Sequence, residues 1–222
     1  MDILYFGKKN DFYSISLYNY LKKFSYKCKV VWSDGKNNIF KRNIKNYDYI
    51  ICFRSHYILK KKHINKARIA CINFHPGTPK YRGIGCANLA IINKEKKYGT
   101  TAHLIDEKID HGKILDIKYF KLKPLINLEE MLKMTHKIMY LQAKKLLKDI
   151  IKKKIAISRL IKKNKNKKWS KNIMTRKKLE NLYSLKLPIK KNKLINLLRG
   201  LEYKSFKPYF KLKNKKYFIS GN

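Results

Sequence analysis

The feature that most constrains the fold is a pair of short apolar segments in the N-terminal half of the chain. Residues Tyr47 to Phe53 form a nearly continuous apolar run, which only Asp48 interrupts, and Arg68 to Phe74 form a second predominantly apolar segment. Such runs are typical of strands that are buried on both faces of a parallel sheet. A helix over about Leu59 to Lys66 would connect them as a right-handed crossover. The sequence therefore predicts an α/β fold with a doubly wound, mostly parallel, Rossmann-like sheet.

The same alternation of strand and helix patterns extends over residues 1–160. It predicts a strand over Asp2–Phe6 that Gly7 closes, a helix over Asp11–Phe24, a strand over Lys27–Trp32, a helix over Cys86–Asn93, strands over Gly99–Ile105 and Lys113–Lys121, and an amphipathic helix over Glu129–Lys154. Residues 161–222 are expected to form a basic linker, Lys162–Lys168, and a small C-terminal subdomain that contains Trp169. A chain of 222 residues is long enough for one domain with such an appendage.

The chain carries a formal net charge of +41 at pH 7. A charge of this size is typical of proteins that bind nucleic acid or anionic membranes. However, 48 of the 55 basic residues are Lys and only 7 are Arg, whereas phosphate and base recognition favours the bidentate Arg side chain. The lysines are spread from Lys8 to Lys216, together with many Asn, Ile and Tyr, whose codons are A/T-rich. Genomic base composition and selection for a polyanionic partner both remain open, and non-specific nucleic-acid binding is expected at low salt.

The sequence predicts neither a membrane-spanning segment nor a secretion signal. The longest apolar run is Tyr49–Phe53, far below the roughly 18 residues that a spanning helix needs, and Met1–Phe6 lacks a basic n-region. The four cysteines lie 15 to 24 residues apart without a C-x-x-C pair, which argues against a zinc site and against a dense disulfide pattern. We expect a cytoplasmic protein with no membrane partner, no metal, and reduced, mostly buried thiols.

The first chemically informative segment is Ile72–Gly83, with the sequence INFHPGTPKYRG. Side chains on a strand alternate between its faces, so Asn73 and His75 point to one side, and Pro76 ends the strand directly afterwards. An amide and an imidazole therefore lie side by side at the carboxyl end of a buried parallel strand, where open α/β sheets bind their ligands. The alternative is that His75 only caps the strand through a hydrogen bond in the core.

The second informative segment is Thr100–Leu115, which joins two predicted strands. Gly112 allows a positive φ in this connection. The connection also contains three acids, Asp106, Glu107 and Asp110. It is either a charged hairpin turn or a loop from which one acid reaches the His75 imidazole, fixes its orientation and raises its pKa.

Together the two segments resemble the formyltransferase family, which includes glycinamide ribonucleotide, methionyl-tRNA and nucleotide-sugar N-formyltransferases. The family pattern is an N-x-H-P strand end, a loop that ends in Tyr-Arg-Gly, a Thr-x-His, and then an acid within I-D-x-G-x-I-L. This sequence matches the pattern at Asn73, His75 and Pro76, at Tyr81, Arg82 and Gly83, at Thr101 and His103, and at Ile109–Leu115. The resemblance implies a formyltransferase catalytic domain over 1–160. It further implies transfer of a formyl group from N10-formyltetrahydrofolate to a primary amine.

The resemblance also implies roles for individual residues. Asn73 would hydrogen-bond the formyl oxygen as negative charge builds on it. His75 would accept the proton of the attacking amine and act as a local cation, and Asp110 would hold His75 and organise water. The second histidine of the pattern, His103, is expected to be structural. Cofactor contacts are implied for His56, Tyr57 and Ile58 in one loop and for Ile105, Asp106 and Glu107 in another, and acceptor contacts for Tyr81, Arg82 and Gly83.

The sequence departs from the family outside these segments, and the departures bear on the acceptor. The loop Pro76–Tyr81 is one residue shorter than the form typical of glycinamide ribonucleotide and methionyl-tRNA enzymes, and it resembles the loop of sugar N-formyltransferases. The tail of about 55 residues is shorter than the barrel domain of methionyl-tRNA formyltransferases. The expected acceptor is therefore a small amine linked to a nucleotide, an amino sugar above all. Methionyl-tRNA and glycinamide ribonucleotide remain alternatives.

A different class of function also remains open, a basic nucleic-acid-binding protein on a formyltransferase scaffold that has lost its activity. The complete set of Asn73, His75 and Asp110 argues against it. A protein that is no longer selected for activity would lose these polar residues before it lost its hydrophobic core. The sequence leaves the oligomeric state open, with a homodimer among the alternatives.

Overall fold

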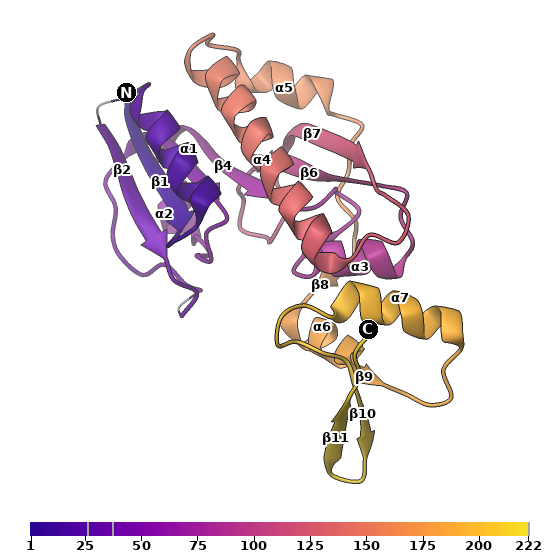
Figure 1. The fold of residues 1–222 in the computed structure, drawn as a ribbon. Helices are drawn as coiled ribbons and strands as arrows, with labels where there is room; N and C mark the ends of the chain where they lie inside the picture. Colours follow the sequence, from indigo (N-terminus) through magenta and orange to yellow (C-terminus); the bar gives the residue numbers. More distant parts are fainter. Residues whose placement is uncertain (26, 37, 222) are drawn as a thin grey trace.

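The computed structural model describes residues 1–25, 27–36 and 38–221. In this part of the chain, a six-stranded sheet has the order β2-β1-β3-β4-β6-β7 (Figure 1). Its strands are β1 (Asp2–Lys8), β2 (Lys27–Ser33), β3 (Tyr47–Phe53), β4 (Ala67–His75), β6 (Lys97–Leu104) and β7 (Ile114–Lys121). Strands β1 to β4 pair in parallel, whereas β6 pairs antiparallel with both β4 and β7. The expected α/β fold with a mostly parallel sheet is confirmed.

Two long helices cover one face of the sheet. These are α1 (Phe12–Lys22) and α4 (Leu128–Ile151), which lie side by side in Figure 1. The main core beneath them contains fully buried side chains from the central strands, Ile3, Tyr5, Ile51, Phe53, Ile72 and Ala102. A second core on the opposite face includes Phe40, and α2 (Lys61–Ile64) packs against it. The burial of β3 and β4 on both faces explains their predominantly apolar runs.

Local sequence signals explain where the two long helices begin. The Asp11 side chain accepts a hydrogen bond from a backbone N–H in the first turn and caps α1. Asn127 and Glu130 form a reciprocal capping box at the start of α4. Along α4, Met131 and Met139 are fully buried, as expected for an amphipathic helix that packs on a sheet.

Two expectations about the middle of the chain can be compared with the structure. The helix predicted over Leu59–Lys66 is shorter, because the chain before it stays extended and Ile58 forms a β-bridge with Ile39. The expectation of free and mostly buried thiols is confirmed: Cys28 is half-buried, and the other three cysteines are buried.

The C-terminal residues form a smaller unit below the sheet in Figure 1. Its elements are β8 (Ile173–Met174), α6 (Arg176–Tyr183), β9 (Ser184–Leu185), α7 (Lys191–Leu201), β10 (Tyr209–Leu212) and β11 (Lys215–Phe218). Helix α7 docks on α3 (Cys86–Ile92), where the Asn88 side chain donates to the carbonyl oxygen of Gly200 at 2.7 Å. Strands β9, β10 and β11 form a small sheet, from which the β10–β11 hairpin projects away from the rest of the molecule.

The segment expected to be a basic linker, Lys162–Lys168, lies against the N-terminal sheet. Helix α5 (Ile157–Lys163) ends inside it, and the Asn164 side chain donates to the carbonyl oxygen of Leu115 in β7 at 2.9 Å. Further on, β8 pairs with the short strand β5 (Arg82–Gly83). The chain after α5 therefore runs back along the sheet before it enters the C-terminal unit.

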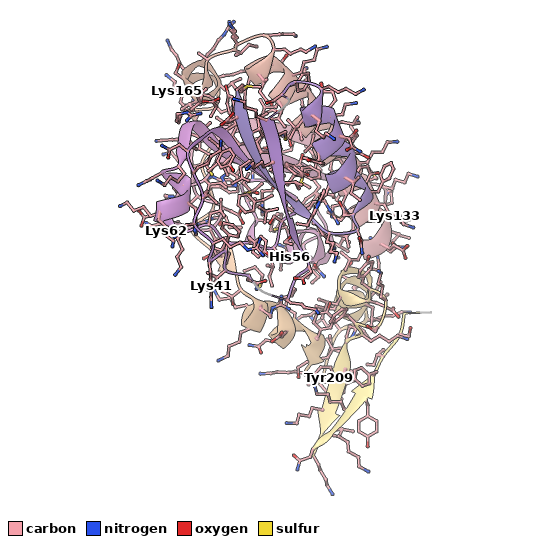
Figure 2. All side chains as sticks on the ribbon, turned by 90° about the vertical axis from the view of Figure 1, so that its left-hand side faces the viewer. Lys41, His56, Lys62, Lys133, Lys165 and Tyr209 are labelled. Carbon is pink, nitrogen blue, oxygen red and sulfur yellow. The ribbon has the colours of Figure 1, made fainter. Side chains whose placement is uncertain are left out.

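Lysine side chains extend outward from all parts of the molecule. Figure 2 shows Lys165, Lys62 and Lys41 along one side of the ribbon and Lys133 on the opposite side. This distribution agrees with the even spread of lysines along the sequence. None of the helices in the described residues is both long and apolar enough to cross a bilayer.

Candidate active site

The antiparallel pairing of β4 with β6 brings polar side chains together at the carboxyl end of β4. In this register Asn73 lies opposite His103, and His75 lies opposite Thr101. The amide nitrogen of Asn73 lies 3.1 Å from Nε2 of His103. His75 points to the same face because strand side chains alternate, whereas Phe74 belongs to the core beneath α4.

The loop between β6 and β7 brings Asp110 to these side chains. Oδ2 of Asp110 lies 3.2 Å from Nδ1 of His75, and Oδ1 lies 3.6 Å from Nε2 of His103. The backbone N–H of Gly83 donates to Oδ2 at 2.8 Å. One carboxylate therefore contacts both imidazoles, and we call Asn73, His75, His103 and Asp110 the polar cluster.

The left-handed residue of this loop is Asp110, with a φ of 45°, and not Gly112 as expected from the sequence. Asp tolerates this conformation better than most residues. Gly112 is required for a different reason, since a Cβ atom there would lie 1.9 Å from the carbonyl oxygen of Leu104. The close approach of two backbone segments, and not a special φ, explains this glycine.

His75 and Asp110 form a buried ion pair. Nε2 of His75 lies 2.8 Å from the carbonyl oxygen of Tyr81, so both ring nitrogens face acceptors. Burial opposes a charge on this imidazole, but the Asp110 carboxylate and Cys86 outweigh it and raise the pKa of His75 well above its ordinary value. Burial would likewise raise the pKa of Asp110, but the charge of His75 and the hydrogen bond from His75 hold it well below its usual range. The expected contact between an acid and His75 is therefore present.

His103, for which the sequence analysis expects a structural role, lies at the centre of the polar cluster. Its Nδ1 is 2.7 Å from the carbonyl oxygen of Leu104, which assigns the Nδ1 proton to that bond. Its Nε2 faces both Asn73 and Asp110. Among the described residues, His103 is the one hydrogen-bond partner of the Asn73 side chain, so it fixes that amide and leaves the rest of its hydrogen-bonding capacity for a ligand.

A cavity of about 320 Å³ opens beside the polar cluster. Asn73, His103 and Asp110 line it, whereas His75 is 2% exposed and lies outside its walls. Two loops provide much of the remaining wall, and they include all six residues with implied cofactor contacts: His56, Tyr57, Ile58, Ile105, Asp106 and Glu107. Figure 2 shows His56 near the sheet edge that faces the C-terminal unit. We call this space the folate cavity, although its contact with a folate stays a prediction.

Tyr81, Arg82 and Gly83, which are expected to contact the acceptor, are not among the described residues that line the folate cavity. The Tyr81 side chain is buried, and its hydroxyl donates to Glu95 at 2.7 Å. Gly83 holds Asp110 through its N–H. The contacts of these residues support the polar cluster, and their contact with an acceptor stays a prediction.

Trp169, which follows α5, packs against both histidines of the polar cluster. Its ring centroid lies 5.6 Å from that of His75 and 5.0 Å from that of His103, in edge-to-face arrangements. Its indole N–H donates to the carbonyl oxygen of Gly112 at 2.9 Å. The sequence predicts Trp169 in the C-terminal subdomain and does not predict its contact with the polar cluster, because no sequence pattern near residue 169 indicates which segment it packs against.

Arg82 ties the segment of Trp169 to the loop of Asp110. One guanidinium nitrogen donates to the carbonyl oxygen of Ser170 at 3.0 Å, and another donates to that of Ile109 at 2.7 Å. Ile109 directly precedes Asp110. Arg82 therefore bridges two segments that are distant in the sequence and fixes the backbone on which the catalytic candidate Asp110 lies.

The arrangement has a defined chemical capacity. The Asn73 amide can donate to an oxygen that gains negative charge, and the nearby ion pair supplies a positive imidazolium and a carboxylate that can orient water. Among the described residues, no group of three or more His, Cys, Asp or Glu side chains is placed to hold a metal ion.

Residues 34–147 match the family model described as "Formyl transferase". The methionyl-tRNA formyltransferase of Clostridium novyi (strain NT) is 36% identical over 120 residues, which are 53% of this chain and 38% of that protein. The chain thus spans less than half of the length of the curated relatives it matches first.

Solved structures with the same fold include two N-formyltransferases. A sugar N-formyltransferase from Shewanella sp. has a TM-score of 0.74 at 22% identity, with 99% of this chain and 97% of that chain covered. An N-formyltransferase from Helicobacter canadensis, in complex with folinic acid and dTDP-3-aminofucose, has a TM-score of 0.70 at 16% identity, with 97% and 86% covered. At these identities the likeness shows the fold alone. With the family model matching about half of its length, the chain belongs to the formyl transferase family.

Proposed function

We propose that the protein transfers a formyl group from N10-formyltetrahydrofolate to a primary amine, and that this amine belongs to a nucleotide-linked amino sugar. The observation that carries the proposal is the position of the polar cluster. An amide and a buried imidazolium–carboxylate pair meet at the wall of a cavity that two loops bound. Membership of the formyl transferase family supports a folate as the formyl donor.

The walls of the folate cavity suit a flat, partly apolar ligand. Ile58 and Ile109 line it and are 49% and 47% exposed, so a bound ligand would cover apolar surface that now faces water. Its volume of about 320 Å³ lies within the range of small-molecule sites. The Helicobacter canadensis neighbour was solved with folinic acid, a folate.

In the proposed reaction, the amine nitrogen attacks the formyl carbon, the bond from this carbon to N10 breaks, and the amine proton passes to N10. Asn73 donates its amide N–H to the formyl oxygen as charge develops there, and His103 holds it in position. The His75 imidazolium adds a fixed positive charge close by. Asp110 lines the cavity and orients the water molecule through which the proton moves.

The role of His75 differs in one respect from the one that the sequence resemblance implies. The resemblance implies that His75 accepts the amine proton as well as acting as a cation. Its ring nitrogens are occupied by Asp110 and the Tyr81 carbonyl, and its raised pKa favours the protonated form. The geometry therefore supports the role of a cation more strongly than that of a proton acceptor.

The proposed activity is tested by following the folate absorbance change with EDTA present and a panel of amines. The panel contains a dTDP-linked and a UDP-linked amino sugar, glycinamide ribonucleotide and charged initiator tRNA. We expect metal-independent turnover with an amino sugar. Turnover that EDTA abolishes, or none with any amine, would contradict the proposal and favour a nucleic-acid-binding protein without activity.

Methionyl-tRNA is the second candidate acceptor, because the Clostridium novyi relative and others of similar identity are methionyl-tRNA formyltransferases. Their matches cover only a minor part of those proteins, whereas this chain aligns over nearly the full length of the Shewanella sugar N-formyltransferase. Formylation of charged tRNA without turnover of either amino sugar would decide for this second candidate.

A further inference from the structure

A second cavity, of about 540 Å³, lies between α6, the first turns of α4 and the β10–β11 hairpin. We call it the aromatic cavity, because five aromatic side chains line it: Tyr183, Tyr203, Phe206, Tyr209 and Phe218. Figure 2 shows Tyr209 at the base of the projecting hairpin. This space lies outside the folate cavity and outside the polar cluster.

Several of these rings are left in contact with water. Phe206 and Phe218 are each 63% exposed, although a phenylalanine gains stability from burial. Tyr209 and Phe218 meet edge-on with centroids 5.8 Å apart, and Tyr183 and Phe206 lie 6.4 Å apart. Exposed aromatic faces around a cavity suit a planar ring that stacks on them.

Three cationic side chains line the same cavity, Arg176, Lys207 and Lys216. Lys216 lies 4.5 Å from the centre of the Tyr209 ring, and Lys207 is 3.9 Å from Glu202. Arg176, in contrast, makes no hydrogen bond or ion pair with any residue that the structure describes. An unpaired guanidinium presents a fork of N–H donors that matches a phosphate group.

The aromatic cavity adjoins the folate cavity. Arg176 and Ile84 line both of them. The pKa of His56, in a loop of the folate cavity, is lowered mainly by burial and by the charges of Lys8 and Arg54. The charge of Arg176 lowers it further, so Arg176 lies close to this loop. A ligand seated in the aromatic cavity can therefore extend past Ile84 and Arg176 towards Asn73.

We propose that the aromatic cavity binds the nucleoside diphosphate part of the acceptor, with the base stacked on the exposed rings and a phosphate held by Arg176. This inference rests on the proposed function and places the amine end of the same molecule in the folate cavity. The exposed rings and the three cations suit a ligand with two phosphates and one base. A long polynucleotide would instead need an extended cationic track with repeated stacking platforms.

Calorimetric titration of dTDP and UDP into the full-length protein, without a folate or an amine, tests this inference. We expect saturable binding of at least one of them. Phe218→Ala should weaken it about tenfold, which is the typical loss of a base-stacking ring. Arg176→Ala should weaken it by a similar factor through the lost phosphate contact. Lys177→Ala is the matched control, because Lys177 neighbours Arg176 on α6 but does not line either cavity. The affinity of this variant for dTDP and UDP should stay within about twofold of wild type.

Binding of folinic acid is measured separately, so that this inference and the proposed function can fail independently. Phe218→Ala should leave folinic acid binding unchanged. If neither dTDP nor UDP binds, or if both bind equally well to Phe218→Ala and Arg176→Ala, the inference is overturned even where formyl transfer stands. Binding of a tRNA that depends on Phe218 and Arg176 while dTDP and UDP do not bind would also overturn it, in favour of a nucleic-acid acceptor.

Discussion

The polar cluster and the aromatic cavity are built in opposite ways. The side chains of His75, His103 and Asp110 are 3%, 3% and 9% exposed, and each has several polar partners. The aromatic cavity has rings that are 63% exposed and an arginine without a partner among the described residues. The protein therefore holds the side chains of the polar cluster rigidly but leaves the aromatic cavity open to water. Substitutions in the first region should change turnover, and those in the second should change affinity.

The largest effect is expected from the polar cluster itself. His75→Ala or Asp110→Ala should lower kcat by a factor of about 10² to 10⁴, the usual range for positioned acid–base groups, while folinic acid affinity stays nearly intact. The reason is that, in the proposed reaction, the loop residues hold the folate, whereas His75 and Asp110 stabilise charge and move the proton. Steady-state kinetics and folinic acid titration check both parts. Near wild-type kcat in both variants would show that the assigned site is wrong.

The next effect concerns the lysines that surround both regions. Non-specific binding of tRNA or DNA should weaken about 100-fold or more between roughly 50 and 200 mM salt, because phosphate contacts release counterions. The KM for a nucleotide-linked amino sugar should change little, since such an acceptor carries only two phosphates. Kinetics at both salt concentrations measure this difference. A steep salt dependence of kcat/KM with charged tRNA, and no sugar turnover, would make the charged surface part of acceptor recognition.

A smaller effect is expected at Trp169, which belongs to neither region but packs on the polar cluster. Trp169→Ala should lower kcat about tenfold to a hundredfold, because both histidines lose the ring that holds them in place. The KM for the acceptor should change less than kcat, and Trp169→Phe should restore part of the activity. A change confined to the KM would instead place Trp169 in acceptor binding.

The smallest effect is the contribution of the buried His75–Asp110 pair to the pH dependence of stability. The raised pKa of His75 stabilises the fold below about pH 6.5, and this contribution is lost as the pH rises through the folded-state pKa. The lowered pKa of Asp110 stabilises it above about pH 3.8, and this contribution is lost as the pH falls. Denaturant unfolding of wild type and Asp110→Asn should therefore differ most between these values.

The control for this experiment is Asp106→Asn, which removes an exposed carboxylate that contacts His111. Exposed pairs contribute little, so its unfolding free energy should follow wild type at every pH. If Asp110→Asn and Asp106→Asn show the same pH dependence, the buried His75–Asp110 pair contributes no more to the unfolding free energy than an exposed pair does.

The parts of the site that could be predicted are those encoded within one strand or one turn. Alternation along β4 and the stop at Pro76 place Asn73 and His75 on one face, which the structure reproduces. The catalytic roles of these residues and the domain boundary at residue 160 stay predictions.

The parts that could not be predicted depend on contacts between distant segments. The pairing of Asn73 with His103 follows from the antiparallel register of β6, which no residue of β4 encodes. Trp169 reaches the cluster through the packing of the segment after α5. Arg176, which has no partner among the described residues, and the exposed rings of the hairpin likewise line one cavity only once the C-terminal unit docks on α3.

The pairing of β8 with β5 has a consequence for protein engineering. Residues 169 to 174 are covalently part of the tail, yet they complete the surroundings of His75 and are tied to Arg82. A chimera that exchanges tails between relatives to change the acceptor should therefore be joined after Met174, within the turn that starts α6. A junction at the end of α5 would exchange Trp169 and Ser170, which contact the two histidines and Arg82, together with the tail. We expect such a hybrid to lose activity when only selectivity was meant to change.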